Sequence, residues 1–355
     1  MRFALLASPL RVAATVLVAL AGAVAARWLH LPLPWFTGPL LAVALVSIGG
    51  ARTVPPPHAR DLGQWIIGTA LGLYFTPEVV REIGRLAPWI LLGTLFMITL
   101  GLLGALLLRR LSGESATTSF FASAIGGAPE MAAQAERHQA DGARVDRVAA
   151  SHSLRLMLVA LVVPFALPWV GVQGVAPYAS AAIDVNSAGL AVLCAATAAG
   201  AVVLQRLRAP NVSMIGPLLV AALLTSQGVH LSAMPASLVN AGQLLVGLAL
   251  GVRFAPEFFR AAPRYLAAVT AVTVVYLAVS AAFGAWLAAP SGLALATAVL
   301  ATTPGGIGEM AITAKGLGLG APIVTAFHGI RMIIVVLTIA PLYRMLRPLL
   351  VRAPH

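Results

Sequence analysis

The chain has 355 residues, of which 60% are hydrophobic and only 10% are charged, and its mean hydropathy is +0.94. These polar residues are too few to cover the surface of a water-soluble domain of this size. The composition therefore predicts a polytopic membrane protein. The net charge of +12 comes from basic residues that stand singly or in pairs between apolar runs. This distribution is typical of membrane proteins with positive cytoplasmic loops, and it argues against a nucleic-acid partner.

The first apolar run, residues 10–28, is long enough to cross a membrane. A cleaved signal peptide that ends near Ala26 is the alternative, because Arg2 and Arg11 precede or interrupt the run. The counterpart of this run in the second half, residues 188–204, has no reason to be removed. We therefore expect residues 10–28 to remain as the first membrane helix.

Further apolar runs follow in order, separated by polar or Gly/Pro-containing breaks. In the first half they lie near residues 35–49, 63–75, 87–108, 117–125 and 154–170. In the second half they lie near residues 187–204, 212–227, 239–252, 264–288, 293–303 and 322–343. The second half therefore repeats the order of the first.

Short motifs recur in the two halves at nearly constant spacing. Residues 63–78 and 242–257 share nine of sixteen positions in the pattern Gly-Gln-x3-Gly-x-Ala-Leu-Gly-x2-Phe-x-Pro-Glu. The spacing indicates an internal repeat of roughly 175–180 residues. We therefore divide the chain into a first membrane repeat, residues 1–180, and a second, residues 181–355, within one integral membrane domain.

The basic residues indicate how the two halves are oriented. In the second half the arginines follow the first run, surround the end of the third and follow the last, and the connections between these groups carry no arginine. The groups share one face of the membrane only if the short run 293–303 is a re-entrant half-helix. We predict an all-α polytopic fold of two inverted repeats, each with about five transmembrane helices and a broken or re-entrant helix. Six spans per half is the alternative.

This scheme predicts that both termini are cytoplasmic. In the first half it places more arginines inside than outside, and it leaves Arg137, Arg144 and Arg147 without an assigned face.

The most unusual stretch runs from Ser123 to Met131 and reads Ser-Ala-Ile-Gly-Gly-Ala-Pro-Glu-Met. A similar stretch in the second half runs from Thr302 to Met310 and reads Thr-Thr-Pro-Gly-Gly-Ile-Gly-Glu-Met. Each copy ends an apolar half-span of about 10 residues at a Gly-Gly pair and places a glutamate just beyond. A helix that ends inside a bilayer leaves carbonyl groups unsatisfied unless they line a cavity, and the next helix directs its positive end toward the same cavity.

We therefore predict a substrate or ion site at the two breaks. The residues assigned to it here are Gly126, Gly127, Glu130, Gly305, Gly306 and Glu309. Two such breaks in corresponding positions of the halves are typical of a transporter binding site. The alternative is an interfacial loop with a solvated carboxylate.

A His-x-x-Arg pair follows each break, and its two residues share one face of a helix. The pairs are His152 with Arg155 and His328 with Arg331. Because an arginine within a membrane needs a partner, we expect the two arginines to pair with the two glutamates, in either combination. A static buried ion pair is the alternative to a substrate or proton role.

Two further pairs complete the candidate site. Thr302 and Thr303 precede the second break and offer hydroxyl groups, while Gln64 and Gln243 open the most strongly repeated helix and can hydrogen-bond across an interface. Glycines in that helix are expected to allow close helix packing: Gly68, Gly72, Gly247 and Gly251. The repeated acids Glu78 and Glu257 follow prolines at helix starts, and we interpret them as structural.

These motifs resemble those of the bacterial AbrB membrane-duplication family. The resemblance rests on the two Gly-Gly-x-x-Glu-Met motifs, the His-x-x-Arg pair after each, and the twin Gly-Gln helices, and it spans about Leu10 to Leu346. The family is labelled both an ammonia monooxygenase and a regulator of gene expression. The plan of inverted half-helices is also similar to that of cation/proton antiporters, bile-acid symporters and auxin-type carriers.

The residues argue against an enzyme. None of the seven histidines forms a His-x-His or His-x3-His pair, although copper or iron needs clustered ligands. The single cysteine, Cys194, lies in an apolar run, so neither a disulfide nor a thiolate cluster is available within the chain. We expect no metal and no cofactor. No extramembrane region is long enough for a helix-turn-helix domain, so an effect on gene expression would be indirect.

The sequence therefore predicts a secondary transporter of the bacterial inner membrane, which moves a small solute or ion by alternating access. Glu130 and Glu309 would be proton or cation sites, and Arg155 and Arg331 counter-charges or anion contacts. The competing class is a non-transporting membrane regulator that acts through a partner, and a monooxygenase is the weakest alternative. The expected surroundings are the lipid bilayer and a small-molecule or ion substrate, and the sequence is compatible with an oligomer.

Overall fold

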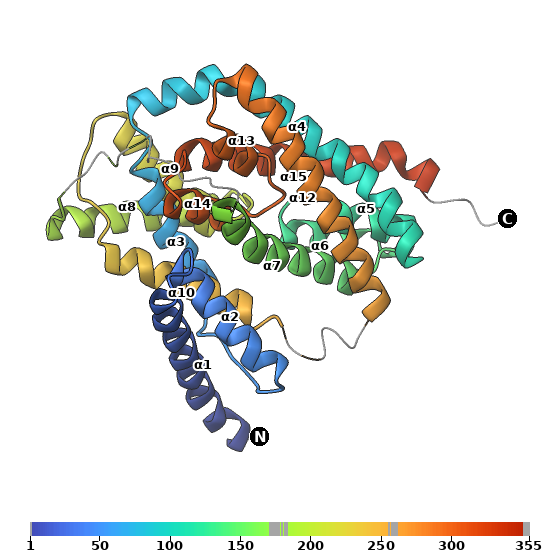
Figure 1. Ribbon diagram of the computed structural model, residues 1–355, viewed down its shortest axis with the longest axis horizontal. Coiled ribbons are helices and arrows are strands. Elements are labelled where there is room, and N and C mark those ends of the chain that lie inside the picture. The colour runs from blue at the N-terminus through green and yellow to red at the C-terminus, as the bar shows by residue number, and fades with distance from the viewer. Residues whose placement is uncertain are drawn as a thin grey trace. The chain divides into compact units, whose positions relative to one another are not determined.

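The computed structural model describes residues 2–169, 184–254 and 262–350, together with 178, 180 and 256 (Figure 1). In the first half the helices are α1 (Arg2–Trp28), α2 (Pro34–Ile48), α3 (Ala59–Gly72), α4 (Pro77–Ser112), α5 (Ala116–Ser123), α6 (Ala128–Arg137), the 3-10 helix η1 (Gln139–Asp141) and α7 (Val145–Trp169). In the second half they are α8 (Ser187–Arg206), α9 (Val212–Ser226), α10 (Ala236–Gly251), α12 (Pro263–Ser291), α13 (Leu295–Ala301), α14 (Ile307–Gly316) and α15 (Ala321–Leu350). Glu257, which we interpreted as structural, lies outside the described residues.

Helix length and composition identify a membrane protein. Among the described residues, six helices are long and apolar enough to cross a membrane: α1, α4, α7, α8, α12 and α15. Helices α2, α9 and α10 are apolar but shorter. Each predicted apolar run falls on a helix, and the order of long and short helices is the same in both halves. The predicted all-α polytopic fold is confirmed.

The helices form two compact units, and each unit draws on both halves of the chain. Unit 1 comprises Met1–Glu82, Val163–Ala261 and Ala311–Pro322. Unit 2 comprises Ile83–Val162, Ala262–Met310 and Ile323–His355. Each unit thus mixes the two predicted repeats, 1–180 and 181–355. Both breaks, from Ser123 to Met131 and from Thr302 to Met310, fall within unit 2.

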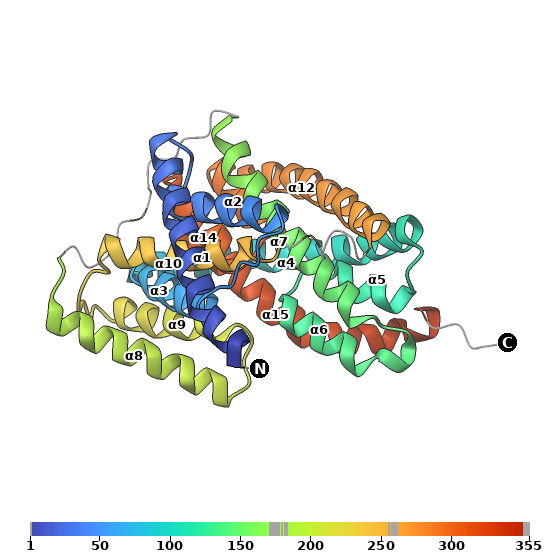
Figure 2. The same ribbon diagram turned by 90° about the horizontal axis from the view of Figure 1, so that it is seen from below.

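Unit 1 is built from α1 to α3 and α8 to α10. Helix α3 packs on α9, α10 packs on α2, and α3 and α10 pack on each other (Figures 1 and 2). Each of these contacts joins a helix of the first half to a helix of the second half. Glycines permit this approach: a Cβ atom on Gly68 would lie 2.5 Å from the Met214 carbonyl oxygen, and one on Gly251 would lie 2.8 Å from that of Leu40. The close packing predicted from the repeated glycines is confirmed, because Gly72 and Gly247 face α9 and α2 equally closely.

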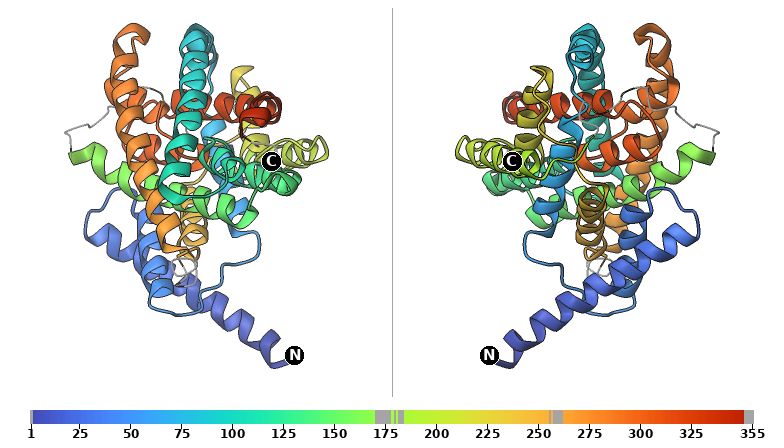
Figure 3. Two further views of the ribbon diagram at one scale, coloured as in Figure 1. Left: turned by 90° about the vertical axis from the view of Figure 1, so that its right-hand side faces the viewer. Right: turned by 90° about the vertical axis from the view of Figure 1, so that its left-hand side faces the viewer.

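In unit 2, helices α4 and α12 run side by side in opposite directions (Figure 3). The rings of Phe96 and Phe283 stack with 3.8 Å between their centroids. Arg85, near the start of α4, donates to the carbonyl oxygen of Ser291 at the end of α12 (3.1 Å). Because these two helices occupy corresponding positions in the halves, their opposite directions are what an inverted repeat requires.

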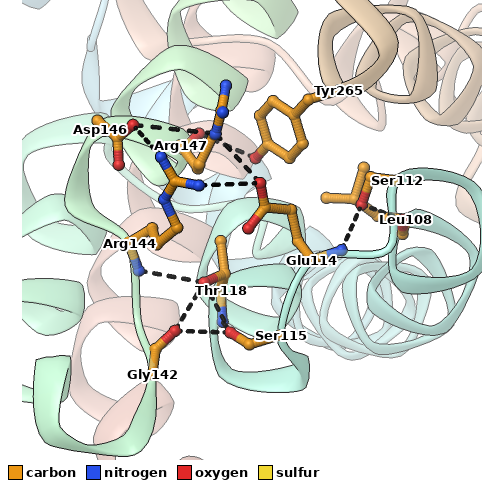
Figure 4. A network of polar contacts seen from close by, with 10 residues as sticks. All are labelled: Leu108, Ser112, Glu114, Ser115, Thr118, Gly142, Arg144, Asp146, Arg147 and Tyr265. Atoms are coloured by element: carbon orange, nitrogen blue, oxygen red, sulfur yellow. Dashed lines mark hydrogen bonds and ion pairs between the residues drawn. The ribbon is translucent and has the colours of Figure 1, made fainter. Parts of the chain in front are cut away.

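The first broken segment is re-entrant. The Ser115 hydroxyl, at the start of α5, donates to the carbonyl oxygen of Gly142, which follows α6 (2.7 Å), and the backbone N–H of Arg144 donates to Thr118 Oγ1 (3.1 Å). Glu114 then joins Arg147 in α7 through an ion pair of 3.1 Å (Figure 4). Helix α5 therefore enters unit 2 at the end where α6 leaves it.

The same end of unit 2 collects basic residues. The start of α12 is there because Tyr265 donates to the Arg147 carbonyl oxygen (2.9 Å), and the end of α15 is there because Arg347 bonds Asp141 (2.8 Å). The arginines in these segments are Arg109, Arg110, Arg137, Arg144, Arg147, Arg264, Arg344 and Arg347. The three arginines that had no assigned face join this group, and we expect this end to face the cytoplasm.

Candidate functional site

The last carbonyl groups of α5 each accept a hydrogen bond from a different buried side chain. The four bonds are His152 Nε2 to Phe121 O (2.9 Å), Ser151 Oγ to Ala122 O (3.0 Å), Tyr276 Oη to Ser123 O (3.0 Å) and Arg155 Nη2 to Ala124 O (3.1 Å). The end of an α-helix leaves up to four carbonyl groups without an intrahelical partner. The carbonyl groups at the end of α5 are therefore satisfied by side chains from α7 and α12.

His152 and Arg155 form a coupled pair within α7. Because His152 Nε2 donates to a carbonyl oxygen, its Nδ1 is the acceptor for Arg155 Nη2 at 2.9 Å. This arrangement requires the neutral imidazole with its proton on Nε2. Both side chains are almost completely buried, with Arg155 only 4% exposed.

The second break uses the corresponding residues in a different way. His328 Nε2 donates to the carbonyl oxygen of Leu300 (3.0 Å). Arg331, which is 6% exposed, donates from Nη1 to Thr303 O (3.0 Å) and from Nη2 to Gly305 O (2.7 Å). Thr302 Oγ1 donates within α13 and lies 3.1 Å from the Ser280 carbonyl oxygen. One arginine therefore satisfies two carbonyl groups here.

The expected ion pairs between arginines and glutamates are absent from the described part of the chain. Arg155 bonds to Ala124 and His152, and Arg331 bonds to two carbonyl oxygens. The prediction was wrong because the end of a half-helix offers free carbonyl groups and a partial negative charge, so it can hold a guanidinium group without a carboxylate.

Each glutamate folds back over the second glycine of its motif. Glu130 is the third residue of α6 and Glu309 the third of α14. A Cβ atom on Gly127 would collide with the Glu130 carboxylate, and one on Gly306 would collide with that of Glu309. A glutamate at the third position faces the positive end of its helix and can reach back to the residue before it. The glutamates therefore complement the start of the second half-helix, while the arginines complement the end of the first.

Each methionine of the motif packs on the first glycine. A Cβ atom on Gly305 would lie 2.6 Å from Met310 Cγ, and one on Gly126 would lie 3.3 Å from Met131 Cε. Both methionines are fully buried. The Gly-Gly-x-x-Glu-Met sequence is thus one local packing unit, in which each glycine makes room for one of the last two side chains.

The two glutamates differ in burial. Glu309 is only 1% exposed, whereas Glu130 is partly exposed. One oxygen of the Glu130 carboxylate, Oε2, is buried without a hydrogen-bond partner in the protein. Of the two carboxylates, Glu130 is therefore the one that is open to the surroundings of unit 2.

A small cavity lies beside Arg155, with room for about one water molecule. Ser123, Ser151, Thr273 and Tyr276 contribute to its wall. Neither Arg155 Nε nor Ser123 Oγ has a partner in the protein. The cavity therefore suits a water molecule that accepts from both groups.

The structure separates the predicted site residues into two sets. The glycines, glutamates, threonines, histidines and arginines of the two breaks lie in unit 2. Gln64 and Gln243 lie in unit 1, in α3 and α10, where a Cβ atom on the neighbouring Gly63 would lie 2.7 Å from the Gly242 carbonyl oxygen. Among the described residues, no group of three His, Cys, Asp or Glu side chains is placed to hold a metal ion.

The sequence interpretation missed Ser151 and Tyr276. Ser151 precedes His152 directly, so a search for polar residues around the His-x-x-Arg pair would have found it. Tyr276 gave no signal, because it is a single tyrosine within an apolar run and belongs to no repeated motif.

Comparison with known proteins agrees with the motifs. The profile described as "Transition state regulatory protein AbrB" matches residues 35–347. The chain is 26% identical over 341 residues to "Uncharacterized protein YhjN" of Bacillus subtilis (strain 168), covering 89% of this chain and 88% of that protein. It is 26% identical over 312 residues to "Putative regulator AbrB" of Escherichia coli (strain K12), covering 87% and 88%. No solved structure matched the chain. Because the family profile covers most of its length, the chain belongs to the AbrB family.

Proposed function

We propose that this protein is a secondary transporter that moves a small solute or ion by alternating access. The observation that supports this most is the pair of half-helix ends in unit 2, each bonded by a buried histidine and arginine and followed by a glutamate. Discontinuous helices in corresponding positions of two halves are typical of transporter sites. Ionisable residues within a membrane are costly and are usually kept for function.

In this proposal the glutamates carry the coupling charge. Glu130 has a carboxylate oxygen, Oε2, without a hydrogen-bond partner in the protein, and we assign the coupling proton or cation to this carboxylate. Glu309 is more deeply buried and follows the same glycine pair in the second half. The buried histidines position the half-helix ends, because each donates to one carbonyl oxygen.

The substrate is to be found first by a thermal-shift screen of the purified protein against small metabolites and inorganic ions. A ligand that binds only the folded state must stabilise it, so a true substrate raises Tm in a concentration-dependent way. Uptake of each stabilising compound into proteoliposomes is then measured with and without a pH gradient.

Glutamine variants test the role of the carboxylates. Glu130→Gln and Glu309→Gln are expected to abolish gradient-driven uptake while the protein still inserts and purifies normally. Glu78→Gln is the matched control, because Glu78 is a repeated acid that is exposed and paired with Arg81 at 3.2 Å. Wild-type uptake by both site variants would exclude the role assigned to the carboxylates.

A second candidate function is membrane-based regulation without transport. It is favoured by the family description and by the name of the Escherichia coli relative, both of which refer to regulation. This candidate predicts a stable protein partner and no solute movement. Affinity purification from solubilised membranes, run beside the uptake assay, separates the two: a stoichiometric partner with no uptake of any stabilising compound favours the regulator.

A further inference from the structure

The carbonyl groups at the second break converge on one guanidinium group. Thr303 O lies 3.0 Å from Arg331 Nη1, and Gly305 O lies 2.7 Å from Arg331 Nη2. At the first break, Ala124 O lies 3.1 Å from Arg155 Nη2. In transporters with discontinuous helices, carbonyl groups in such positions are the usual ligands of a coupling cation such as Na⁺.

Here these carbonyl groups are already bonded to a cation that belongs to the chain. A guanidinium group carries one positive charge and several N–H donors in a fixed plane, so it can bond two carbonyl oxygens at once. Its charge also complements the negative end of α13, as a bound metal cation would. Arg331 is 6% exposed and has no carboxylate partner among the described residues, so its hydrogen bonds go to the carbonyl groups of the break.

We propose that the Arg331 guanidinium takes the place of a coupling metal cation at the second break. The protein therefore needs neither Na⁺ nor K⁺ for the stability of this site. On the function proposed above, movement of its solute is coupled to protons through the carboxylates instead. Arg155 supports the first break less completely, because its Nη2 is shared between Ala124 O and His152 Nδ1.

The test removes the built-in cation and supplies one from solution. We expect Arg331→Ala, purified in choline chloride, to lose roughly 5–10 °C in Tm, because two buried carbonyl groups lose their donor. Millimolar guanidinium should restore at least half of this loss, and Na⁺ a smaller part. The Tm of the wild type and of Arg206→Ala, which removes an exposed arginine at the end of α8, should change with none of these cations.

Binding of radioactive sodium to the wild type provides a readout that does not depend on any variant. We expect no saturable binding. Saturable binding, or a rise in wild-type Tm that is specific to Na⁺ or K⁺, would overturn the proposal. So would an Arg331→Ala variant that is as stable as the wild type, or one that guanidinium does not restore. If Arg331→Ala does not fold, Arg331→Gln, which keeps a planar donor but no charge, takes its place in the rescue measurement.

These measurements need no transport, so the two proposals can fail separately. If guanidinium restores the Tm of Arg331→Ala but no solute is taken up, the transporter proposal is refuted and the proposal that Arg331 replaces a metal cation is supported. Uptake driven by a Na⁺ gradient at equal pH would support the transporter and refute the cation replacement.

Discussion

The two breaks have similar sequences, but the carbonyl groups at the ends of α5 and α13 accept hydrogen bonds from different sets of side chains. At the first break, four side chains each donate to one carbonyl group. At the second, Arg331 donates to two, His328 donates to the Leu300 carbonyl oxygen, and Thr302 and Thr303 donate back into α13. The first end is therefore held by four side chains that donate one bond each, whereas at the second end a single residue, Arg331, supplies two of the bonds.

The largest expected difference is between the two arginines. Arg331→Ala leaves two buried carbonyl groups without a donor and should cost about 2–6 kcal/mol. Arg155→Ala leaves one carbonyl group and His152 Nδ1 without a donor, but three other side chains still bond the end of α5, so the loss should be smaller. Thermal unfolding of both variants in the same lipid or detergent measures this difference. Equal losses would mean that the two breaks share their stabilisation and that the contrast is wrong.

A smaller difference is expected between the first glycines of the two motifs. Gly305→Ala places a Cβ atom 2.6 Å from Met310 Cγ and should cost about 1–3 kcal/mol by overpacking. Gly126→Ala meets its nearest neighbour, Val335 Cγ1, at 3.0 Å and should cost less.

Gly329→Ala is the control for this pair. No atom outside its own helix backbone lies within 4 Å of the added Cβ, so the helix should gain up to about 1 kcal/mol. The three unfolding curves are compared in one buffer. A loss at Gly126 as large as that at Gly305 would show that the first motif is packed as tightly as the second.

The smallest expected effect concerns the contact between Asp141 in η1, which follows α6, and Arg347 in α15, the helix that also contains Arg331. The Arg347 guanidinium bonds Asp141 and holds the pKa of that carboxyl below its usual value. A lowered pKa stabilises the fold above the unfolded pKa of about 3.9, and this contribution is lost as the pH falls through the lower, folded value.

Asp141→Asn should therefore lower Tm slightly at neutral pH, and the gap from the wild type should shrink below about pH 4. Thermal unfolding of both proteins as a function of pH measures the gap. A gap that is constant from neutral to acid pH would show that the charge of Asp141 does not contribute to this contact.

Much of the fold was accessible from the sequence because its signals are local. Apolar runs predict helices, and the repeated glycines at positions such as Gly68 and Gly251 predicted the close packing found in unit 1. The breaks were also visible, since a Gly-Gly pair after a short apolar run is a local feature. The inverted orientation of the two halves in the membrane was inferred from the placement of basic residues, and it stays a prediction. The opposite directions of α4 and α12 are what this orientation requires.

The partners of the breaks were less accessible because they depend on tertiary placement. Nothing near Tyr276 in the sequence indicates that its hydroxyl group donates to Ser123 O. The arginines were recognised but given carboxylate partners, since the sequence shows side chains of opposite charge and does not show which backbone groups lack a bond. The packing of Met131 and Met310 could not be predicted from the sequence either, because each side chain folds back onto a glycine that lies five residues earlier in the chain.

The hairpin of α5 and α6 is fastened to α7 at two levels. Its deep end is held by Ser151, His152 and Arg155, and its shallow end by the contact between Glu114 and Arg147. Sliding the hairpin along α7 would break all of these bonds together, so a gradual displacement is disfavoured at every intermediate position. Any opening and closing of this region should therefore carry the hairpin and the start of α7 as one rigid body, with the hinges at the chain segments that leave it.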